Sequence, residues 1–455
     1  MRIKSIEITN FRGFEHQEVF LNKDICVVIG NNTAGKTTLL KALQIGLGAF
    51  LQSMDSLPGG KAYLRNFSAF DVLKKYDSEK KDYLSNKENP SIRINAQVYS
   101  NDYEEGVLKK SSFNEISWIR KFKGTKTSHT RQDVGNLIDF VKQMEKLRNE
   151  KKHNAILPLL LSFGAKRTSD AQLHNRGKAK ERLSRVAKAY KLALHDKVDY
   201  EGAQNWLKHY DKDITDGKEF LGTRESFFDA LQKAIPALSE IDFDRGEIEA
   251  IVSVTGHEPS RHHLSYMSDG LQSMVNIVSE IAHRCIELNG FLGKSAVSET
   301  PGVVIIDEVD LYLHPRWQRH VLKDLHSAFP KIQFVVSTHS PFIVQSLDSD
   351  DCLISFDHGV LNGGTPFKEG LEDIAQNRMG MPQEIRSKKF MEMENAAKEL
   401  FDALDNHSEN IDSLKERLDR LEAEYSDDPA YLALIRSEYR ARTKSKGSYE
   451  TCKKK

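Results

Sequence analysis

Three short runs of apolar residues predict the strands of a buried parallel sheet. They span residues 25–29, 303–306 and 332–336, and each is followed by glycine, by acidic residues or by small polar residues. Uninterrupted apolar runs of this length are typical of strands that are covered on both faces. Ile3, Ile6 and Ile8 instead lie among polar residues in a period-two pattern. Residues 92–99 alternate in the same way, which predicts an antiparallel strand with one exposed face.

Helical spacing follows the first buried run, from Leu39 to Leu47, so the chain there predicts a strand, a glycine-bounded loop and a helix. Residues ~135–260 are expected to be mostly helical, and apolar stripes at helical spacing return after about residue 370. We therefore predict an α/β fold in four parts. Residues 1–130 and 261–370 form one lobe, 131–260 form a mostly helical insertion, and 371–455 form a helical C-terminal extension with a basic tail.

Composition excludes some classes of protein but does not identify one. A chain of 455 residues is long enough for about three domains, and its 66 basic residues balance 66 acidic residues. This balance excludes a strongly basic protein that coats DNA, although it leaves room for a local basic face. The four cysteines form no CxxC motif, no apolar run is long enough to span a membrane, and the N-terminus is not a signal peptide. We therefore expect a cytoplasmic protein without disulfides.

The loop after the first buried strand matches the phosphate-binding pattern G-x4-G-K-[ST]. Such a loop lets backbone N–H groups surround a phosphate, and the following helix adds positive potential. Lys36 would reach the β- and γ-phosphates, and the Thr37 hydroxyl would bind Mg²⁺. We predict that the nucleotide-binding residues are Gly30, Asn31, Asn32, Thr33, Ala34, Gly35, Lys36, Thr37 and Thr38.

Two acidic residues, Asp307 and Glu308, end the second buried strand. Carboxylates in this position are costly unless they meet a cation or water. We predict that Asp307 belongs to the Mg²⁺ shell and that Glu308 deprotonates the attacking water. The alternative is a pair of acids that caps the next element.

The third buried strand ends in Ser337, Thr338 and His339, and His339 is a candidate contact for the γ-phosphate. Ser268, Asp269 and Gly270 precede a long apolar helix. By themselves they predict an N-cap, but the same geometry can also bind an anion. The order of these motifs along the chain carries more information than any one of them.

This order resembles the ABC ATPase superfamily, and in particular its non-transporter branch that includes SMC, RecF and OLD proteins. Similar segments are IxNFRGF at the start, GNNTAGKTTLLKAL, LSYMSDG, VVIIDEVDLYLHPRWQ and VVSTHSPFIV. The chain looks most like the PtuA ATPases of Septu antiphage systems and like retron-associated ATPases, and residues 156–167 resemble one of their segments. The sequence departs from the superfamily at Thr33, where glycine is common, and at the SDG signature. Gln97 is a weak candidate for the glutamine of the Q-loop.

The resemblance implies an ABC nucleotide-binding domain that binds ATP and Mg²⁺ and hydrolyses ATP. It also implies a head-to-tail homodimer, possible higher oligomers, and a separate HNH nuclease as partner. Ser268 and Gly270 would then act on the ATP of the other protomer, and Arg12 would contact phosphate unless it is a salt-bridging turn residue. Two other functions stay open: a RecF- or SMC-like DNA-repair ATPase, and a nucleotide-gated scaffold with little hydrolysis.

Two basic clusters could contact DNA through its phosphates, or could be solvated helix faces. The first cluster is Arg120, Lys121, Lys123, Lys126 and Arg131. The second is Arg176, Lys178, Lys180, Arg182, Arg185, Lys188 and Lys191.

Overall fold

A computed structural model describes most of the chain as two compact units, Met1–Ile374 and Ala375–Lys455. The residues that it describes are 1–58, 63–85, 88–104, 107–124, 126–128, 130–150, 155–165, 183–196, 201–253, 258–356, 366–380, 388–406, 410–424 and 429–452. None of the helices among these residues is long and apolar enough to cross a membrane.

A five-stranded, fully parallel sheet forms the centre of the first unit. Its order is β15 (Cys352–Ser355), β3 (Ile25–Ile29), β14 (Ile332–Ser337), β13 (Gly302–Ile306) and β9 (Leu159–Phe163). The three strands predicted from apolar runs are confirmed, and every residue of β3, β13 and β14 is buried. Because the strands are parallel, the segments that follow them gather at one edge of the sheet.

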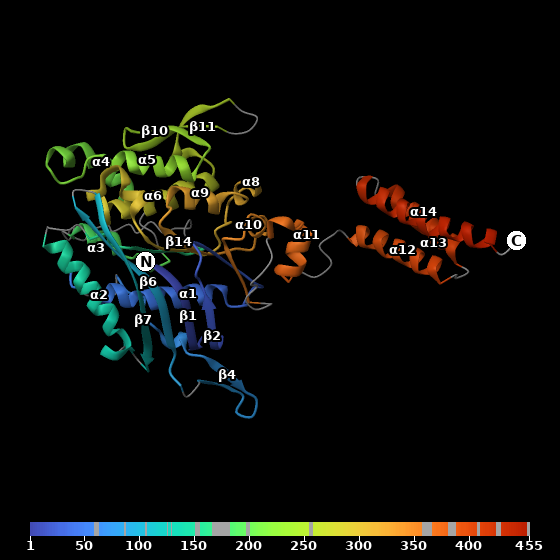
Figure 1. The fold of residues 1–455 in the computed structure, drawn as a ribbon, viewed down its shortest axis with the longest axis horizontal. Helices are drawn as coiled ribbons and strands as arrows, with labels where there is room; N and C mark the ends of the chain where they lie inside the picture. The colour runs from blue at the N-terminus through green and yellow to red at the C-terminus, as the bar shows by residue number, and fades with distance from the viewer. Residues whose placement is uncertain are drawn as a thin grey trace. The chain divides into compact units, whose positions relative to one another are not determined.

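A second, antiparallel sheet lies on the other side of helix α1 (Lys36–Gln52) (Figure 1). Its strands are β2 (Phe14–Phe20), β1 (Arg2–Phe11), β6 (Ser91–Glu104), β7 (Val107–Lys123) and β8 (Lys126–Ser128). Helix α1 is buried on nearly all sides because both sheets cover it. A Cβ at Gly46 would lie 2.4 Å from the Ile94 side chain, so this glycine permits the close packing of α1 on β6.

Helices cover the remaining faces of the first unit, with α5, α6 and α9 together on one side (Figure 1). The helices are α2 (Arg131–Asn149), α3 (Arg185–Tyr190), α4 (Glu201–Thr215), α5 (Thr223–Ala234), α6 (Asp269–Asn289), α7 (Ala296–Glu299), α8 (Pro315–Gln318), α9 (Val321–Ala328), α10 (Pro341–Gln345) and α11 (Leu371–Asp373). A small hairpin joins β4 (Lys74–Asp77) and β5 (Asp82–Ser85).

The expectation of a mostly helical insertion at 131–260 is wrong in part. Strand β9 lies within it but pairs with β13 in the central sheet. Residues 238–252 form β10 (Leu238–Asp244) and β11 (Glu247–Val252), which continue into β12 (Ser260–His263). The apolar run of β9 cannot be told from a buried helical segment by periodicity alone, and only its pairing with β13 settles it.

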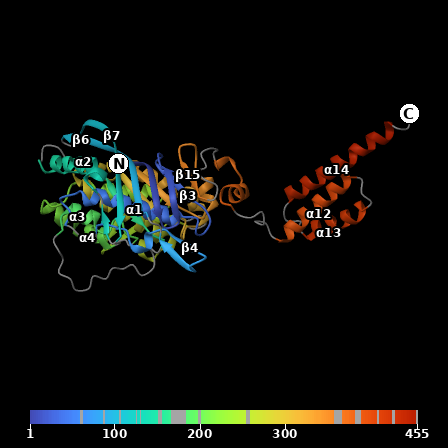
Figure 2. The same ribbon diagram turned by 90° about the horizontal axis from the view of Figure 1, so that it is seen from below.

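The second unit is helical, as predicted, and consists of α12 (Lys388–Asp405), α13 (Ile411–Glu424) and α14 (Pro429–Cys452) (Figure 2). Its apolar stripes pack against one another around a core of Met393, Ala396, Ala397, Leu400, Leu404, Leu418, Leu432 and Ile435. A helix as short as α13 cannot bury its apolar stripe alone, and it does so here against α12 and α14.

Candidate functional site

The phosphate-binding loop connects β3 to α1 with a backbone that favours glycine at two positions. Gly30 has φ 146° and Gly35 has φ 115°, and a Cβ at Gly35 would lie 2.4 Å from the Phe14 ring. Thr33 also has a positive φ, 75°, at the position where related loops often carry glycine. A β-branched residue in this region is strained by roughly 1–3 kcal/mol, so this departure from the family pattern has a structural cost.

Lys36 lies under this loop and bonds to its backbone. Its side chain is buried, and its ammonium donates to the carbonyl oxygens of Gly30 at 2.6 Å and Asn31 at 3.1 Å. The Ala34 N–H donates to the Asn31 carbonyl and closes the turn. Asn31, Asn32, Thr33 and Thr37 are exposed at the rim, and Thr38 is half-buried.

The segments that follow β3, β13 and β14 bring Thr37 to Asp307, and Asp307 and Glu308 to Ser337. The Thr37 hydroxyl lies 3.4 Å from Asp307 Oδ2, although 270 residues separate them in the sequence. The buried Ser337 hydroxyl donates to Asp307 Oδ1 at 2.5 Å and accepts from the Glu308 N–H at 2.8 Å. Ser337 therefore fixes both acidic residues, a role that the sequence alone did not reveal.

Glu308 has a φ of 51°, which is unusual for a residue other than glycine. Strained backbone of this kind persists where the surroundings hold it, here through Ser337. His339 follows β14 and is exposed. Its neighbour Thr338 donates to Asp310 at 2.6 Å, which ties the loop after β13 to the loop after β14.

The signature residues lie at the start of α6. Ser268 is the N-cap residue, but its side chain makes no capping hydrogen bond, and both Ser268 and Asp269 are exposed. Gly270 is buried, and a Cβ there would lie 2.4 Å from the Tyr312 carbonyl oxygen. The signature thus packs against the loop after Glu308. Among the described residues, no hydrogen bond joins it to the phosphate-binding loop of the same chain.

Arg12 forms the salt bridge that was the alternative to a phosphate contact. Its Nε donates to Asp71 at 2.7 Å, and its N–H donates to the Asp71 carbonyl. Burial alone would raise the pKa of Asp71, but hydrogen bonds from Ser68 and the charge of Arg12 lower it. Asp71 is therefore an ionised partner, and Arg12 is held beside the site.

One residue of each basic cluster is engaged within the fold. Arg120 is fully buried and donates to the carbonyls of Ile45 and Arg65, which makes it a packing residue and not a DNA contact. In the second cluster, Arg185 pairs with Glu219 and Glu287. Arg176, Lys178, Lys180 and Arg182 lie outside the described residues.

A partly buried polar network beside the site involves four residues that the sequence did not identify as functional. Gln44 Nε2 donates to Ser162 Oγ at 2.6 Å and to Asp196 Oδ1 at 3.0 Å, and Arg65 Nη1 donates to Gln44 and Asp196. Gln97, the weak Q-loop candidate, instead lies within β6 opposite Arg2 and Glu115, away from the carboxyl ends of the parallel strands.

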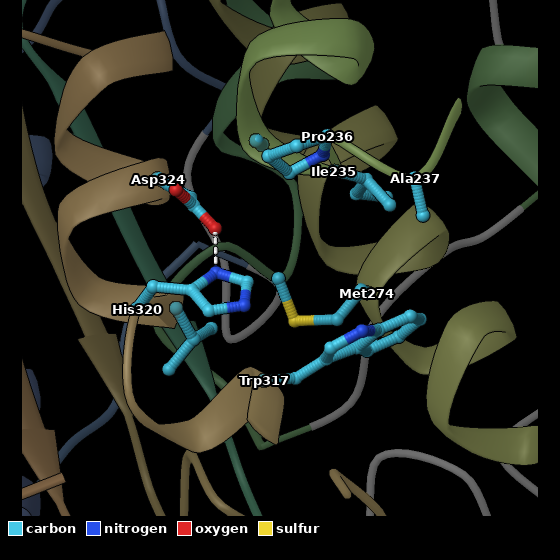
Figure 3. Close-up of a pocket in the computed structure, with 9 residues that line it drawn as sticks. Ile235, Pro236, Ala237, Met274, Trp317, His320 and Asp324 are labelled. Carbon is cyan, nitrogen blue, oxygen red and sulfur yellow. Dashed lines mark hydrogen bonds and ion pairs between the residues drawn. The ribbon is translucent and has the colours of Figure 1, made fainter. Parts of the chain in front are cut away.

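An apolar pocket of about 240 Å³ lies elsewhere in the first unit (Figure 3). Met274 of α6 and Trp317 of α8 form part of its wall, and the hydrogen-bonded pair of His320 and Asp324 lines one side. None of the sequence-predicted site residues lines this pocket, so it is separate from the phosphate-binding loop.

Comparisons with known proteins agree with the motifs. A family model described as an AAA ATPase domain matches residues 1–344. The Retron Ec83 probable ATPase of Escherichia coli is 23% identical over 81% of this chain and 73% of its own length, and the Retron Vc95 probable ATPase of Vibrio cholerae is 23% identical over 78% and 73%. The Septu protein PtuA of Bacillus mycoides is 31% identical over 33% of this chain and 21% of its own length.

Among solved structures, the SMC head domain from Thermotoga maritima aligns with 78% of this chain and 94% of that one, at 13% identity and a TM-score of 0.40. The resemblance to retron and Septu ATPases that the motifs indicated is confirmed by the sequence relatives.

Proposed function

Because the chain belongs to the AAA ATPase domain family, we propose that it is a cytoplasmic ATPase that hydrolyses ATP to ADP and phosphate in a Mg²⁺-dependent reaction. One observation carries this proposal. The Thr37 hydroxyl contacts the Asp307 carboxylate, and Ser337 joins that carboxylate to the Glu308 backbone, where three parallel strands end.

The residues present fit Mg²⁺ bound with a nucleotide. A hydroxyl and a carboxylate that lie 3.4 Å apart are a donor set that suits this ion, which usually takes one or two protein ligands and completes its shell with water and phosphate oxygens. Mg²⁺ would neutralise charge on the phosphates. Gly30 to Thr38 would hold the phosphates, with the Lys36 ammonium exchanging carbonyl partners for phosphate oxygens.

In the hydrolytic step, Glu308 would accept a proton from the water that attacks the γ-phosphate. The Ser337 hydroxyl bonds to the Asp307 carboxylate and to the Glu308 backbone N–H, so it would hold the Asp307 side chain and the Glu308 backbone in place. His339, exposed at the end of the neighbouring strand, would contact the γ-phosphate.

We also propose that two chains associate head to tail, so that Ser268, Asp269 and Gly270 of one protomer cover the ATP of the other. The exposure of Ser268 and Asp269 supports this assembly. Gly270 packs against the Tyr312 carbonyl, so closure of the dimer over Gly270 would also act on the loop after Glu308.

The biological role that we propose is antiphage defence, in which this ATPase regulates a separate HNH nuclease. The similarity to retron ATPases and to Septu PtuA proteins supports this role. A DNA-repair ATPase is the second candidate, but the burial of Arg120 and the ion pairs of Arg185 give it less support.

Replacing Glu308 by Gln tests the ATPase proposal. We expect turnover to fall by about 10²–10⁴-fold while a fluorescent ATP analogue binds as before, because Lys36, Thr37 and Asp307 stay in place. Glu299→Gln, at a surface ion pair with Lys331, is the matched control. Turnover by Glu308→Gln within a few-fold of wild type would contradict the role of Glu308.

A phage-plaque assay tests the defence role. Cells that carry this gene with an adjacent HNH nuclease gene should resist phage, and the Glu308→Gln variant should lose that resistance. Equal plaque numbers for wild type and empty vector across a phage panel would contradict the role in defence and leave the ATPase proposal intact.

A further inference from the structure

Helix α1 presents three polar side chains toward the ends of β9 and β13. Thr37, Lys41 and Gln44 are spaced by four and three residues, which places them on one face of the helix. Thr37 lies beside Asp307, and Gln44 bonds to Asp196. Lys41 therefore lies on the same helix face, between the residue beside Asp307 and the residue bonded to Asp196.

Asp196 is held in place from three directions. Gln44 Nε2 and Arg65 Nη1 donate to its two oxygens at 3.0 and 3.2 Å. Gly164, the residue after β9, packs so closely that a Cβ there would lie 2.6 Å from the Asp196 Cβ. The Asp307 N–H donates to the carbonyl of Phe163, the residue before Gly164, so Asp196 and Asp307 both lie beside the end of β9.

The charged groups around Lys41 shift its pKa in opposite directions. Burial lowers the pKa of Lys41, and the nearby guanidinium groups of Arg12 and Arg65 lower it further, while Asp196 and Asp307 act in the opposite direction. Burial would raise the pKa of Asp196, but the hydrogen bond from Gln44 and the charge of Arg65 lower it, so this carboxylate is ionised. The Lys41 ammonium is thus attracted to both acids.

We propose that Asp196 is a positioning residue that attracts the Lys41 ammonium away from Asp307, so that Mg²⁺ and not Lys41 neutralises Asp307. Asp196 and Asp307 are the two acids that act on Lys41, so without Asp196 only Asp307 would attract the ammonium, which would then compete with the cation. This inference rests on the proposed ATPase function only for the assignment of Mg²⁺ to Thr37 and Asp307.

Binding of mant-ATP, measured by fluorescence as Mg²⁺ is titrated, tests the inference without any need for hydrolysis. We expect Asp196→Asn to bind mant-ATP like wild type in EDTA, and to need about 10-fold more Mg²⁺ for half of the Mg²⁺-dependent tightening. Lys41→Gln should need no more Mg²⁺ than wild type. The double variant Lys41→Gln/Asp196→Asn should recover the midpoint of Lys41→Gln, because the competing ammonium is gone.

Asp211→Asn is the matched control, since Asp211 is an exposed carboxylate paired with Arg224. An unchanged Mg²⁺ midpoint in Asp196→Asn, or a double variant no better than Asp196→Asn, would overturn the inference. If Asp196→Asn does not fold, the Lys41→Gln variant alone decides. A Mg²⁺ midpoint above that of wild type would overturn the inference, and a Mg²⁺ midpoint at or below that of wild type would support it. A wild-type protein whose nucleotide binding ignores Mg²⁺ would instead refute the proposed Mg²⁺ site itself.

Discussion

Replacing Ser337 by Ala removes the hydroxyl that joins the two acidic residues of the site. Ser337 is fully buried, donates to Asp307 Oδ1 at 2.5 Å and accepts from the Glu308 N–H at 2.8 Å. The substitution creates almost no cavity, so its effect comes from these two hydrogen bonds. We expect it to lower both the stability of the first unit and the rate of hydrolysis.

The magnitude follows from the type of each bond. A hydrogen bond to a carboxylate contributes about 1.5–3 kcal/mol and one between neutral groups about 1 kcal/mol, which together give roughly 2.5–4 kcal/mol. Asp307 and Glu308 are only half-buried, so water can replace part of this loss. We therefore expect the free energy of unfolding to fall by about 1–3 kcal/mol. Looser carboxylates should lower kcat by about tenfold.

Urea unfolding followed by tryptophan fluorescence suits this measurement. All three tryptophans, Trp118, Trp206 and Trp317, lie within Met1–Ile374, so the signal reports on the first unit alone. Ser279→Ala is the matched control, because the buried Ser279 hydroxyl has no hydrogen-bond partner in the described structure. This control should leave stability unchanged or slightly raised.

A Ser337→Ala variant would contradict this role of Ser337 if its free energy of unfolding lay within about 0.5 kcal/mol of the wild-type value and its rate of ATP hydrolysis within twofold. An equal loss of stability in Ser279→Ala would also contradict it, because the effect would then come from any buried serine hydroxyl and not from the bonds to Asp307 and Glu308.

Three further predictions address assembly, the second unit and pH. Ser268→Arg should bind nucleotide but not hydrolyse it, and a mixture with Lys36→Ala should regain at most one composite site per dimer; normal turnover by Ser268→Arg alone would argue against head-to-tail closure. Deletion of 388–455 should leave nucleotide binding and the tryptophan-detected melting unchanged, because α12–α14 bury their core among themselves, while the oligomer mass by light scattering or the retention of a partner nuclease falls. Burial would raise the pKa of Asp133, but hydrogen bonds from Lys121 and Thr130 lower it from 3.8 to about 2. The ionised Asp133 therefore stabilises the fold fully above about pH 4, and this stabilisation is lost as the pH falls through 2. The difference in melting temperature between wild type and Asp133→Asn should shrink over that interval, and a constant difference would refute this assignment.

Much of the candidate site follows from short-range patterns in the sequence. The apolar runs at 25–29, 303–306 and 332–336 specify three buried strands, and the residues after them are the phosphate-binding loop, Asp307 with Glu308, and His339. Parallel strands bring such segments to one edge. The proximity of Thr37 to Asp307 could therefore be anticipated without knowledge of any other contact.

Side-chain partners were less predictable. Arg120 belongs to a basic segment that looked solvated, yet it is buried because its guanidinium caps carbonyls of α1 and of the loop at Arg65. Nothing local in the sequence distinguishes an arginine that packs under a helix from one that faces water. Cys26 and Cys352 are likewise far apart in the chain but lie opposite each other on β3 and β15, as free thiols.

The sequence by itself determined the chemistry at the strand ends, because apolar runs, glycines and acids act over a few neighbouring residues. The tertiary structure alone decided that β9 joins the central sheet, that Ser337 fixes both acids, and that Asp196 reaches the polar face of α1. These depend on which distant segments pack together. Strand pairing and burial are cooperative properties of the whole fold, so they cannot be predicted from any short segment of the sequence.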